Sequence, residues 1–420
     1  MRFAVIADDD TGATDAAGML TARGVRTVLV LDVRRPPDAR RLAGFDAIVV
    51  GTQARSVAPR EAGRRTSEAI AFARRFQPRL LQIKYCSTFD STPRGNIGPS
   101  LDAALDATGA AMSIVSPALP VSGRTTYMGH HFVGRELLSE SPLRHHPLNP
   151  MTDSNLARWL QRQTRRRVAL IDLTEIRRGP AAVRRRLDAL RREGAAYVVT
   201  DAIAPRDLRT TLEAARDHRV VSGGSGLTAE APRLLFPGRR RLSFAARLKA
   251  LRPGLAVISG SRSPATERQR AAALGAGFAE VAVVPAEVWS GRFDAAAALG
   301  RARAALARGR PVLVHARAGG RRPAGWSEAR AGLAIGRALS AIAAGLARGP
   351  GGVGRLVVAG GETSGAVCRR LGFGALEIGR PIDPGVPYAF PLDDPGLLVV
   401  LKSGNFGSDD LYNKVRRLRR

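Results

Sequence analysis

Short runs of β-branched and other apolar residues alternate along the chain with longer segments in which Ala, Leu and Arg recur at helical spacing. Such alternation is typical of α/β proteins, in which the helices between successive strands cover both faces of a sheet. In the first half the pattern predicts helices at about 12–22, 59–75, 99–107, 180–193 and 206–217, and strands at Phe3–Ala7, Thr27–Leu31, Ala47–Gly51, Leu80–Lys84, Ser113–Ser116, Val168–Ile171 and Tyr197–Thr200.

The pattern breaks near residues 232–254, where Pro, Gly and clustered arginines interrupt regular structure. Such a segment is typical of a linker between domains. The alternation then resumes, with helices expected at about 264–275, 294–308, 326–347 and 363–371, and strands at Leu255–Ser259, Val281–Val284, Val312–His315, Leu356–Ala359 and Leu397–Leu401. We therefore expect two α/β domains, residues 1–235 and 254–420, joined by a linker.

Composition narrows the class of protein. With 420 residues, of which 45% are hydrophobic, the chain can bury a sizeable core, which excludes a disordered protein. No apolar stretch of about 18 residues lacks a charge or a breaker, and the acidic run Asp8–Asp10 interrupts the N-terminal apolar residues, so we expect neither a membrane span nor a secretory signal. Cys86 and Cys368 are too few for a disulfide framework, and the cytoplasm is the expected location.

The charge is strongly basic, with 66 Lys and Arg against 36 Asp and Glu and a formal net charge of +30. The excess is spread over both halves of the chain, whereas a nucleic-acid-binding surface concentrates it. Solvated arginine faces, binding of a polyanion, and attraction for small anionic substrates all remain open. Only four of the bases are lysine, namely Lys84, Lys249, Lys402 and Lys414. Two of these rare lysines, Lys84 and Lys402, lie in the motifs described below.

Two motifs follow predicted strands of the first domain. Asp8, Asp9 and Asp10 precede a helix, where carboxylates can cap the helix, hold Mg²⁺ or act as a base. The segment from Lys84 to Thr92 holds a rare lysine, many hydroxyls and Asp90, which could accept a hydroxyl proton. The alternatives are helix capping alone for the first motif and a Ser/Thr-rich turn for the second.

A third segment, residues 117–153, contains two pairs of adjacent histidines. Adjacent histidines lack the usual spacing of a zinc site, so we favour a polar loop that faces the substrate over a metal site, with plain loop structure as the alternative. Arg124, between Gly123 and Thr125, is the best candidate there for holding an anion.

Three Gly- and Ser-rich turns follow predicted strands of the second domain. They occupy residues 259–263, 360–365 and 402–407, and the first two open helices whose N-terminal amides suit a phosphate. Together they indicate a nucleotide site, with simple strand–helix turns as the alternative. The sequence contains neither a G-x-x-x-x-G-K-[ST] phosphate loop nor the signatures of a protein kinase.

In this order the motifs resemble the four-carbon acid sugar kinase family, two-domain enzymes that phosphorylate tetronate-type acids with ATP. Within it, Lys84–Thr92, Pro117–Pro120 and His146–Met151 are most similar to the 3-oxo-tetronate 4-kinase subgroup. Asp10 stands where the family usually has an apolar residue, and Arg262 stands where it usually has a small or apolar one.

The motifs and this resemblance imply a sugar-acid-binding N-terminal domain and a C-terminal domain that binds ATP, with Mg²⁺ bridging the phosphates. Catalytic roles are expected for Asp90, Asp9 and Lys84, with either acid orienting or deprotonating the attacking hydroxyl. The expected substrate-binding residues are Asp8, Asp9, Arg55, Ser56, Lys84, Ser87, Asp90, Ser91, Thr92 and Arg124; the expected nucleotide-binding residues are Ser259, Ser261, Ser263, Gly360, Gly361, Glu362, Thr363, Lys402 and Gly404.

The resemblance implies ATP-dependent phosphorylation of the C4 hydroxyl of 3-dehydro-tetronate (3-oxo-tetronate) in carbohydrate acid catabolism. The expected partner is a small acid sugar, without nucleic acid or membrane, and a homo-oligomer stays open. The alternatives are a D-threonate or D-erythronate kinase, a basic nucleic-acid-binding protein, and a sugar-acid sensor that has lost catalysis.

Overall fold

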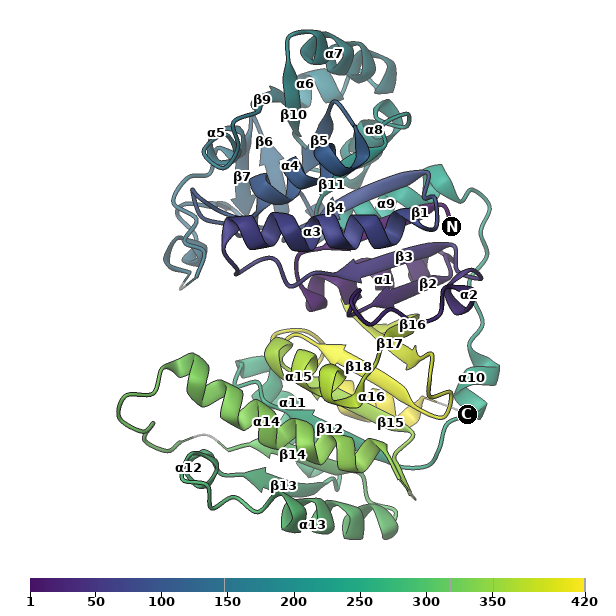
Figure 1. Ribbon diagram of the computed structural model, residues 1–420, viewed down its shortest axis with the longest axis vertical. Helices are drawn as coiled ribbons and strands as arrows, with labels where there is room; N and C mark the ends of the chain where they lie inside the picture. Colours follow the sequence, from purple (N-terminus) through teal and green to yellow (C-terminus); the bar gives the residue numbers. More distant parts are fainter. Residues whose placement is uncertain (147, 318, 350, 419–420) are drawn as a thin grey trace. The chain divides into compact units, whose positions relative to one another are not determined.

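The computed structural model describes residues 1–146, 148–317, 319–349 and 351–418 (Figure 1). The chain divides into two compact units, Met1–Arg241 and Leu242–Arg420. Each unit has a largely parallel sheet with helices packed against it, which confirms the expectation of two α/β domains. Pro147, within one of the motifs above, and the terminal Arg419 and Arg420 lie outside the described residues.

In the first unit the main sheet has the strand order β2-β3-β1-β4-β11-β5-β10-β9, and its neighbouring strands are parallel. Its strands are β1 (Phe3–Ala7), β2 (Thr27–Val30), β3 (Ala47–Gly51), β4 (Leu80–Lys84), β5 (Ser113–Ser116), β9 (Arg167–Ile171), β10 (Ala195–Thr200) and β11 (Val220–Gly223). The central strands are buried along their whole length, because helices cover both faces of a parallel sheet.

The helices of this unit pack in two series. In one series α1 contacts α9, α9 contacts α8, and α8 contacts α7; in the other α3 contacts α4, and α4 contacts α5. The helices are α1 (Asp10–Ala22), α2 (Ala39–Leu42), α3 (Pro59–Arg74), α4 (Ile97–Thr108), α5 (Leu156–Gln161), α6 (Leu173–Ile176), α7 (Pro180–Arg192), α8 (Pro205–Ala214) and α9 (Ser225–Leu235), with 3₁₀ turns at Pro120–Ser122 and Pro142–His145.

Part of the segment expected to be a polar loop forms a small antiparallel sheet. It consists of β6 (Arg124–Tyr127), β7 (His130–Val133) and β8 (Glu136–Leu137), paired in that order. A tight turn joins the first two strands, in which Met128 and Gly129 both have positive φ. Polar residues dominate these short strands, which is why the hydrophobic pattern does not reveal them.

In the second unit the strand order is β13-β14-β12-β15-β18-β17-β16, parallel from β13 to β18 and antiparallel beyond. The strands are β12 (Leu255–Ser259), β13 (Ala279–Val283), β14 (Val312–Ala316), β15 (Arg355–Ala359), β16 (Ala375–Asp383), β17 (Val386–Pro391) and β18 (Leu398–Lys402). The helices are α10 (Ala245–Lys249), α11 (Pro264–Gly275), α12 (Pro285–Trp289), α13 (Ala295–Ala307), α14 (Glu328–Ala347), α15 (Gly361–Leu371) and α16 (Leu411–Arg417).

Two features of the second unit bear on the sequence expectations. Part of the expected linker, residues 242–253, belongs to this unit, where Phe244 and Leu251 are buried in its core. The helix α14 is long and apolar enough to cross a membrane by length and composition alone. It packs against α12, α13, α15 and strands of the sheet.

Candidate functional site

The residues of the first candidate site lie at the carboxyl ends of β1, β3 and β4, three neighbouring parallel strands. Chain connections leave β1 on one side toward β2 and β3, and then cross to β4 on its other side. Ligands of open α/β sheets bind at such a switch point. Asp8, Arg55 and Lys84 are therefore brought to one edge by the topology, although they are far apart in sequence.

Arg55 is fixed by two carboxylates. Its Nε and Nη2 donate to Asp8 Oδ2 and Oδ1, both at 2.8 Å, and Nη2 also lies 2.9 Å from Asp9 Oδ1. Burial raises the pKa of Asp8, while the Arg55 guanidinium acts in the opposite direction. Burial also disfavours the Arg55 cation, but Asp8 and Asp9 more than offset this and raise its pKa. The result is a rigid cation held at the strand ends.

Asp9 also begins the first helix, since its Oδ1 accepts from the Gly12 amide at 2.8 Å and caps α1. Its neighbour Asp10, the departure from the family pattern, accepts from Gln53 Nε2 at 2.8 Å. Both acids therefore have structural partners, which limits their freedom to accept a proton from a substrate.

Lys84 ends β4 and is only 4% exposed. A Cβ at Gly12 would lie 2.2 Å from Lys84 Nζ and 2.4 Å from Asp9 Oδ1, so glycine at this position lets the start of α1 approach both groups closely. Among the described residues Lys84 Nζ has no hydrogen-bond or ion-pair partner, in contrast to Arg55. The lysine is thus a buried cation that can still take an anionic ligand.

Asp90 faces the same place. Asp8, Lys84, Asp90 and Asn96 are among the residues that line one small cavity. Asp90 Oδ1 accepts from Thr88 Oγ1 at 2.5 Å, and Thr88 Oγ1 lies 3.0 Å from Cys86 Sγ. Burial raises the pKa of Cys86 to about 11, so this thiol is protonated at neutral pH and is a poor nucleophile.

Ser91 points away from this cavity into the protein. It is fully buried, and its Oγ accepts from Trp159 Nε1 at 3.0 Å and from Gln163 Nε2 at 2.9 Å. Thr92 is half-buried, and Ser56 is exposed beyond Arg55. Among the expected substrate-binding residues, Ser91 is therefore the one whose hydroxyl is buried and hydrogen-bonded to other side chains of the protein.

Arg124 lies near a buried histidine of the small sheet. His131 of β7 is fully buried, and its Nδ1 lies 3.0 Å from Thr126 Oγ1. Burial lowers the pKa of His131 to about 4, and nearby Arg124 acts in the same direction. The imidazole is therefore neutral at neutral pH, and its hydrogen bond to Thr126 joins β7 to β6.

Asn96 completes the site and does not stand out in the sequence. Its Nδ2 donates to the backbone carbonyl of Ala54 at 2.6 Å and also to that of Arg55, which fixes the turn after β3. Its place at the start of α4 is the only local signal, because a helix start is a usual place for asparagine.

The second candidate site lies at the carboxyl ends of β12, β15 and β18, again neighbouring parallel strands. A Cβ at Gly260 would lie 2.1 Å from Thr363 Oγ1, and one at Gly404 would lie 2.5 Å from Ser261 Oγ. Gly360 has a φ of +114°, which a side chain would strain. The glycines therefore let the three turns meet, as a cradle for phosphate requires.

The remaining expected nucleotide-binding residues differ in exposure. Ser259 is buried, Ser261 and Ser263 are half-buried, Gly361 and Glu362 are exposed at the start of α15, and Thr363 is buried behind them. Ser263 caps α11 by accepting from the Thr266 amide at 3.2 Å. Arg262 points to solvent and lies 3.7 Å from Glu328.

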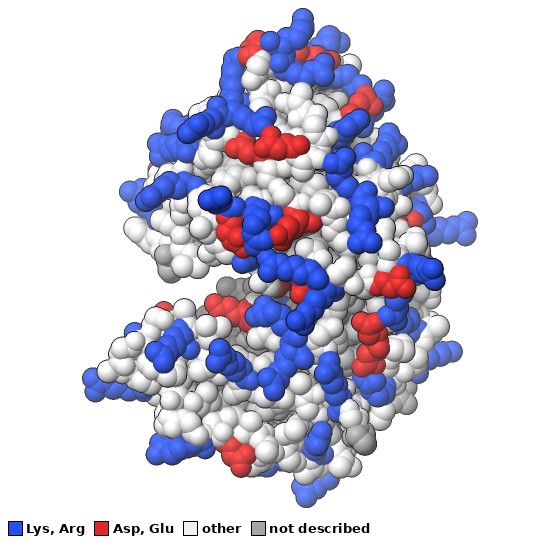
Figure 2. Space-filling model, viewed as in Figure 1, with Lys and Arg blue, Asp and Glu red and all other residues white. Residues whose placement is uncertain are grey.

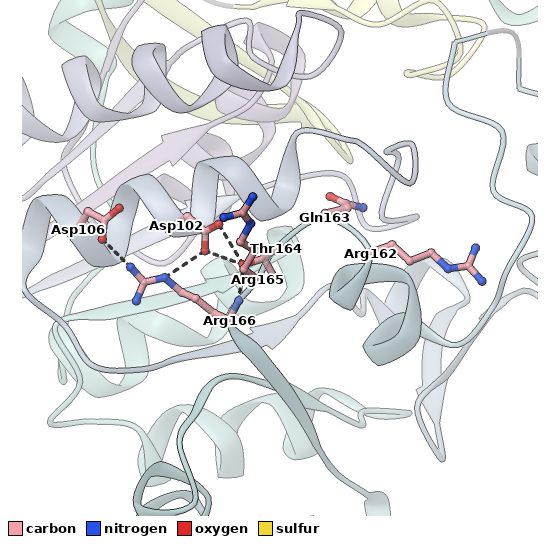
Figure 3. Close-up of a pocket in the computed structure, with 7 residues that line it drawn as sticks. All are labelled: Asp102, Asp106, Arg162, Gln163, Thr164, Arg165 and Arg166. Carbon is pink, nitrogen blue, oxygen red and sulfur yellow. Dashed lines mark hydrogen bonds and ion pairs between the residues drawn. The ribbon is translucent and has the colours of Figure 1, made fainter.

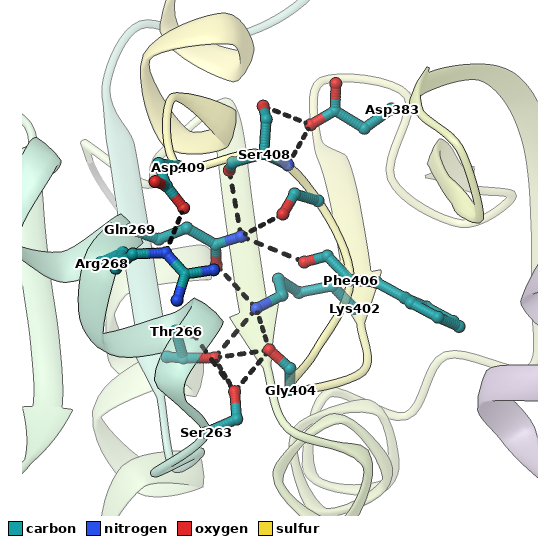
Figure 4. A network of polar contacts seen from close by, with 11 residues as sticks. Ser263, Thr266, Arg268, Gln269, Asp383, Lys402, Gly404, Phe406, Ser408 and Asp409 are labelled. Carbon is teal, nitrogen blue, oxygen red and sulfur yellow. Dashed lines mark hydrogen bonds and ion pairs between the residues drawn. The ribbon is translucent and has the colours of Figure 1, made fainter.

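Lys402 lies beneath these turns (Figure 4). It is 1% exposed, and its Nζ donates to Gln269 Oε1 at 2.7 Å, Thr266 Oγ1 at 3.0 Å and the Gly404 carbonyl at 3.0 Å. Burial lowers its pKa to about 8. Sequence reasoning identified the lysine but neither Thr266 nor Gln269, since no local pattern marks them.

Charged residues elsewhere in the described part of the chain do not form a comparable site. Figure 2 shows Lys and Arg side chains scattered over the visible face with acidic groups between them. A surface pocket beside α4 is rich in arginine, but Arg166 is paired with Asp102 and Asp106 there, and Arg162 points away from them (Figure 3). The described residues contain no group of three His, Cys, Asp or Glu that could hold a metal.

Comparison with known domains assigns a class to each unit. The family of sugar-binding N-terminal domains matches residues 3–231, and the family of nucleotide-binding C-terminal domains matches residues 256–412. The chain thus combines a sugar-binding domain with a nucleotide-binding domain. Each has polar groups at the carboxyl edge of its sheet, where ligands of such sheets bind. This combination is that of a kinase of small sugar-like molecules.

Whole-chain relatives are similar in length and sequence. Proteins named 3-oxo-tetronate kinase from Burkholderia multivorans and Cupriavidus necator are 42% and 40% identical over 98% of this chain and 96% of their own. The crystal structure of a protein from Salmonella typhimurium LT2 is 36% identical, with a TM-score of 0.83 and coverage of 100% of both chains. The crystal structure of a protein from Haemophilus influenzae is 31% identical, with a TM-score of 0.81 and coverage of 99% of both chains.

The chain belongs to the four-carbon acid sugar kinase family, which confirms the resemblance found in its motifs. It is a kinase, and its nucleotide-binding domain fits the expected use of ATP. These comparisons favour the kinase over a nucleic-acid-binding protein.

Proposed function

We propose that the protein transfers the γ-phosphoryl group of ATP to the C4 hydroxyl of 3-oxo-tetronate (3-dehydro-tetronate), in the carbohydrate acid catabolism of the cytoplasm. The observation that carries the proposal is the cavity lined by Asp8, Lys84, Asp90 and Asn96 at the edge where Arg55 is fixed. Cations and a carboxylate together suit an acid that must also lose a hydroxyl proton. The names of the relatives support this choice of acid.

The geometry favours Asp90 over Asp9 as the group that accepts the proton. One oxygen of Asp9, Oδ1, accepts from the Gly12 amide that begins α1 and also contacts Arg55, so this oxygen already has two structural partners. Among the residues that the structure describes, Asp90 receives a hydrogen bond from the neutral hydroxyl of Thr88 alone. The C4 oxygen then attacks the γ-phosphorus, the bond to the β-phosphate oxygen breaks, ADP leaves and the proton goes to Asp90.

Arg55 and Lys84 have different tasks in this proposal. Arg55 binds Asp8 and Asp9 through Nε and Nη2, which leaves its Nη1 to donate to the C1 carboxylate beside the exposed hydroxyl of Ser56. Lys84 is a compact charge without a hydrogen-bonding partner of its own among the described residues, so it is suited to the phosphoryl group in transit.

Mg²⁺ would arrive with the nucleotide, because the phosphates supply most ligands of such an ion and a protein adds one or two carboxylates. Glu362, exposed at the start of α15, is the acid that the three nucleotide turns offer, and the donor set therefore fits an ion that is shared with phosphate. A bound ion would supply positive charge to the phosphates, while the chain's own residues position the acid and accept its proton.

An assay of ADP release over a panel of four-carbon acids tests the proposal. We expect turnover of 3-oxo-tetronate well above that of D-threonate and D-erythronate. Turnover of D-threonate without the 3-oxo acid would contradict the choice of substrate while leaving the family intact. Turnover that persists at the wild-type rate in Lys84→Met would contradict the site, with the exposed Lys249→Met as the matched control.

A further inference from the structure

Lys402 is unusual because it is a buried cation without an acidic partner. The three acceptors of its ammonium group are a hydroxyl, a side-chain amide and a backbone carbonyl, all neutral. A charge taken out of water is costly unless it is well satisfied, and burial lowers the pKa of this lysine to about 8. With every N–H in use and 1% of the residue exposed, Lys402 has no donor left for a phosphate.

The three acceptors belong to the parts of the nucleotide cradle. Thr266 and Gln269 lie on α11, the helix that begins after the Ser259–Ser263 turn. Gly404 lies in the turn that follows β18. Gln269 also donates to the carbonyls of Phe406, Gly407 and Ser408 at 3.0, 3.0 and 3.1 Å. Lys402 thus joins a helix start to a loop that shares no backbone pairing with it (Figure 4).

The Gly404 carbonyl is turned inward by several donors. It lies 2.6 Å from Ser263 Oγ and 2.9 Å from Thr266 Oγ1, in addition to its bond from Lys402. The described chain contains no cis peptide bond, and in a trans peptide the carbonyl and the next N–H point in opposite directions. The Asn405 N–H therefore points away from Lys402, on an exposed residue, and no described residue accepts from it.

We infer that Lys402 is a positioning residue of the nucleotide site, which holds the Gly404 carbonyl inward so that the Asn405 backbone N–H can donate to a phosphate of ATP. A lysine suits this place better than the arginines found elsewhere in the chain, because three tetrahedral donors match three acceptors around one point. Its charge beneath the turn also favours an anion above it. The inference rests on the proposed use of ATP by these turns.

Steady-state kinetics on three variants test the inference. Lys402→Met removes the charge and the donors, Thr266→Val removes one hydroxyl from the same carbonyl, and Lys249→Met is the control at an exposed lysine. We expect Lys402→Met to raise KM for ATP about tenfold or more, as loss of a charge-assisted hydrogen bond implies. Thr266→Val should raise KM for ATP about two- to threefold, and KM for the acid should stay unchanged in both.

The readouts separate positioning from direct contact. If Lys402 itself touched a phosphate, Thr266→Val would leave KM for ATP at the wild-type value while Lys402→Met raised it, and the inference would be wrong. It would also be wrong if Lys402→Met raised both KM values equally or left both unchanged. Should Lys402→Met fail to fold in a thermal melt, Thr266→Val decides by the same criterion. A wild-type protein that releases no ADP would instead contradict the proposed function.

Discussion

The ion pair between Arg55 and Asp8 yields the most quantitative prediction, made for Arg55→Met. Removal of one partner from a buried pair costs about 3–5 kcal/mol, while an exposed pair contributes about 0–1 kcal/mol. The two side chains are 21% and 13% exposed, so we place the loss of unfolding free energy between these limits, at about 2–3 kcal/mol. For a domain of 150–250 residues this lowers Tm by about 4–12 °C.

The loss should depend on pH in a defined direction. Burial raises the pKa of Asp8, and removal of Arg55 takes away the main opposing effect, so the pKa of Asp8 rises further in the variant. At a pH below the usual value of 3.8 the carboxyl is protonated in both the folded and the unfolded state, and no buried charge is left unpaired. The destabilisation therefore grows as the pH rises from 3.8 toward the raised pKa and is constant above it, so it is larger at pH 8 than at pH 5.

Thermal melts of the wild type, Arg55→Met and Asp8→Asn/Arg55→Met at pH 5 and pH 8 check this reasoning. The double variant should regain part of the Tm at pH 8, because it has no carboxylate to bury. A Tm loss in Arg55→Met that is equal at both pH values, or a double variant no more stable than the single one, would refute the account.

Four further predictions concern single residues. Asp90→Asn should lower kcat by about 10²- to 10⁴-fold with little change in Tm; a wild-type kcat would exclude Asp90 as the base. Ser91→Ala should lower the free energy of unfolding in urea by about 1–3 kcal/mol and leave KM for the acid unchanged, because Trp159 and Gln163 lose their acceptor; a raised KM alone would contradict this. N-ethylmaleimide at pH 7.5 should leave activity intact, because burial raises the pKa of Cys86 to about 11; rapid inactivation that Cys86→Ser abolishes would overturn this. Between about pH 8 and 10.5 the folded protein should have lost the Lys402 proton that the unfolded chain keeps, so the wild type should gain stability with pH relative to Lys402→Met; parallel pH profiles would speak against it.

Strands of β-branched residues could be predicted from the sequence almost to the residue. Phe3–Ala7, Ala47–Gly51, Leu80–Lys84 and Leu255–Ser259 have the expected bounds, because buried parallel strands are continuous apolar runs. The hairpin of β16 and β17 was not predicted, because prolines interrupt both strands and Gly379 interrupts the apolar pattern of β16. That glycine lies under the Tyr388 ring, where a Cβ would come within 2.0 Å of it, a cross-strand contact without a local signal.

The site was predictable as far as topology alone decides it. Residues that follow neighbouring parallel strands meet at one edge, which brings the motifs of Asp8 and Lys84 together, whereas Arg55 was expected only from the resemblance to the family. The direction of a side chain was not predictable. Ser91 faces inward because Trp159 and Gln163 offer donors from about 70 positions away, and Lys402 is held by a glutamine 133 positions earlier.

The most direct test of the central claim is the ³¹P spectrum of the product formed from ATP and 3-oxo-tetronate. The account places the phosphate on the C4 oxygen, beside a CH₂ group, so the proton-coupled signal of the product should be a triplet. A doublet would place the phosphate on the C2 oxygen, beside a single C–H, and would contradict the proposed reaction. The absence of any new phosphate ester would contradict the proposed substrate itself.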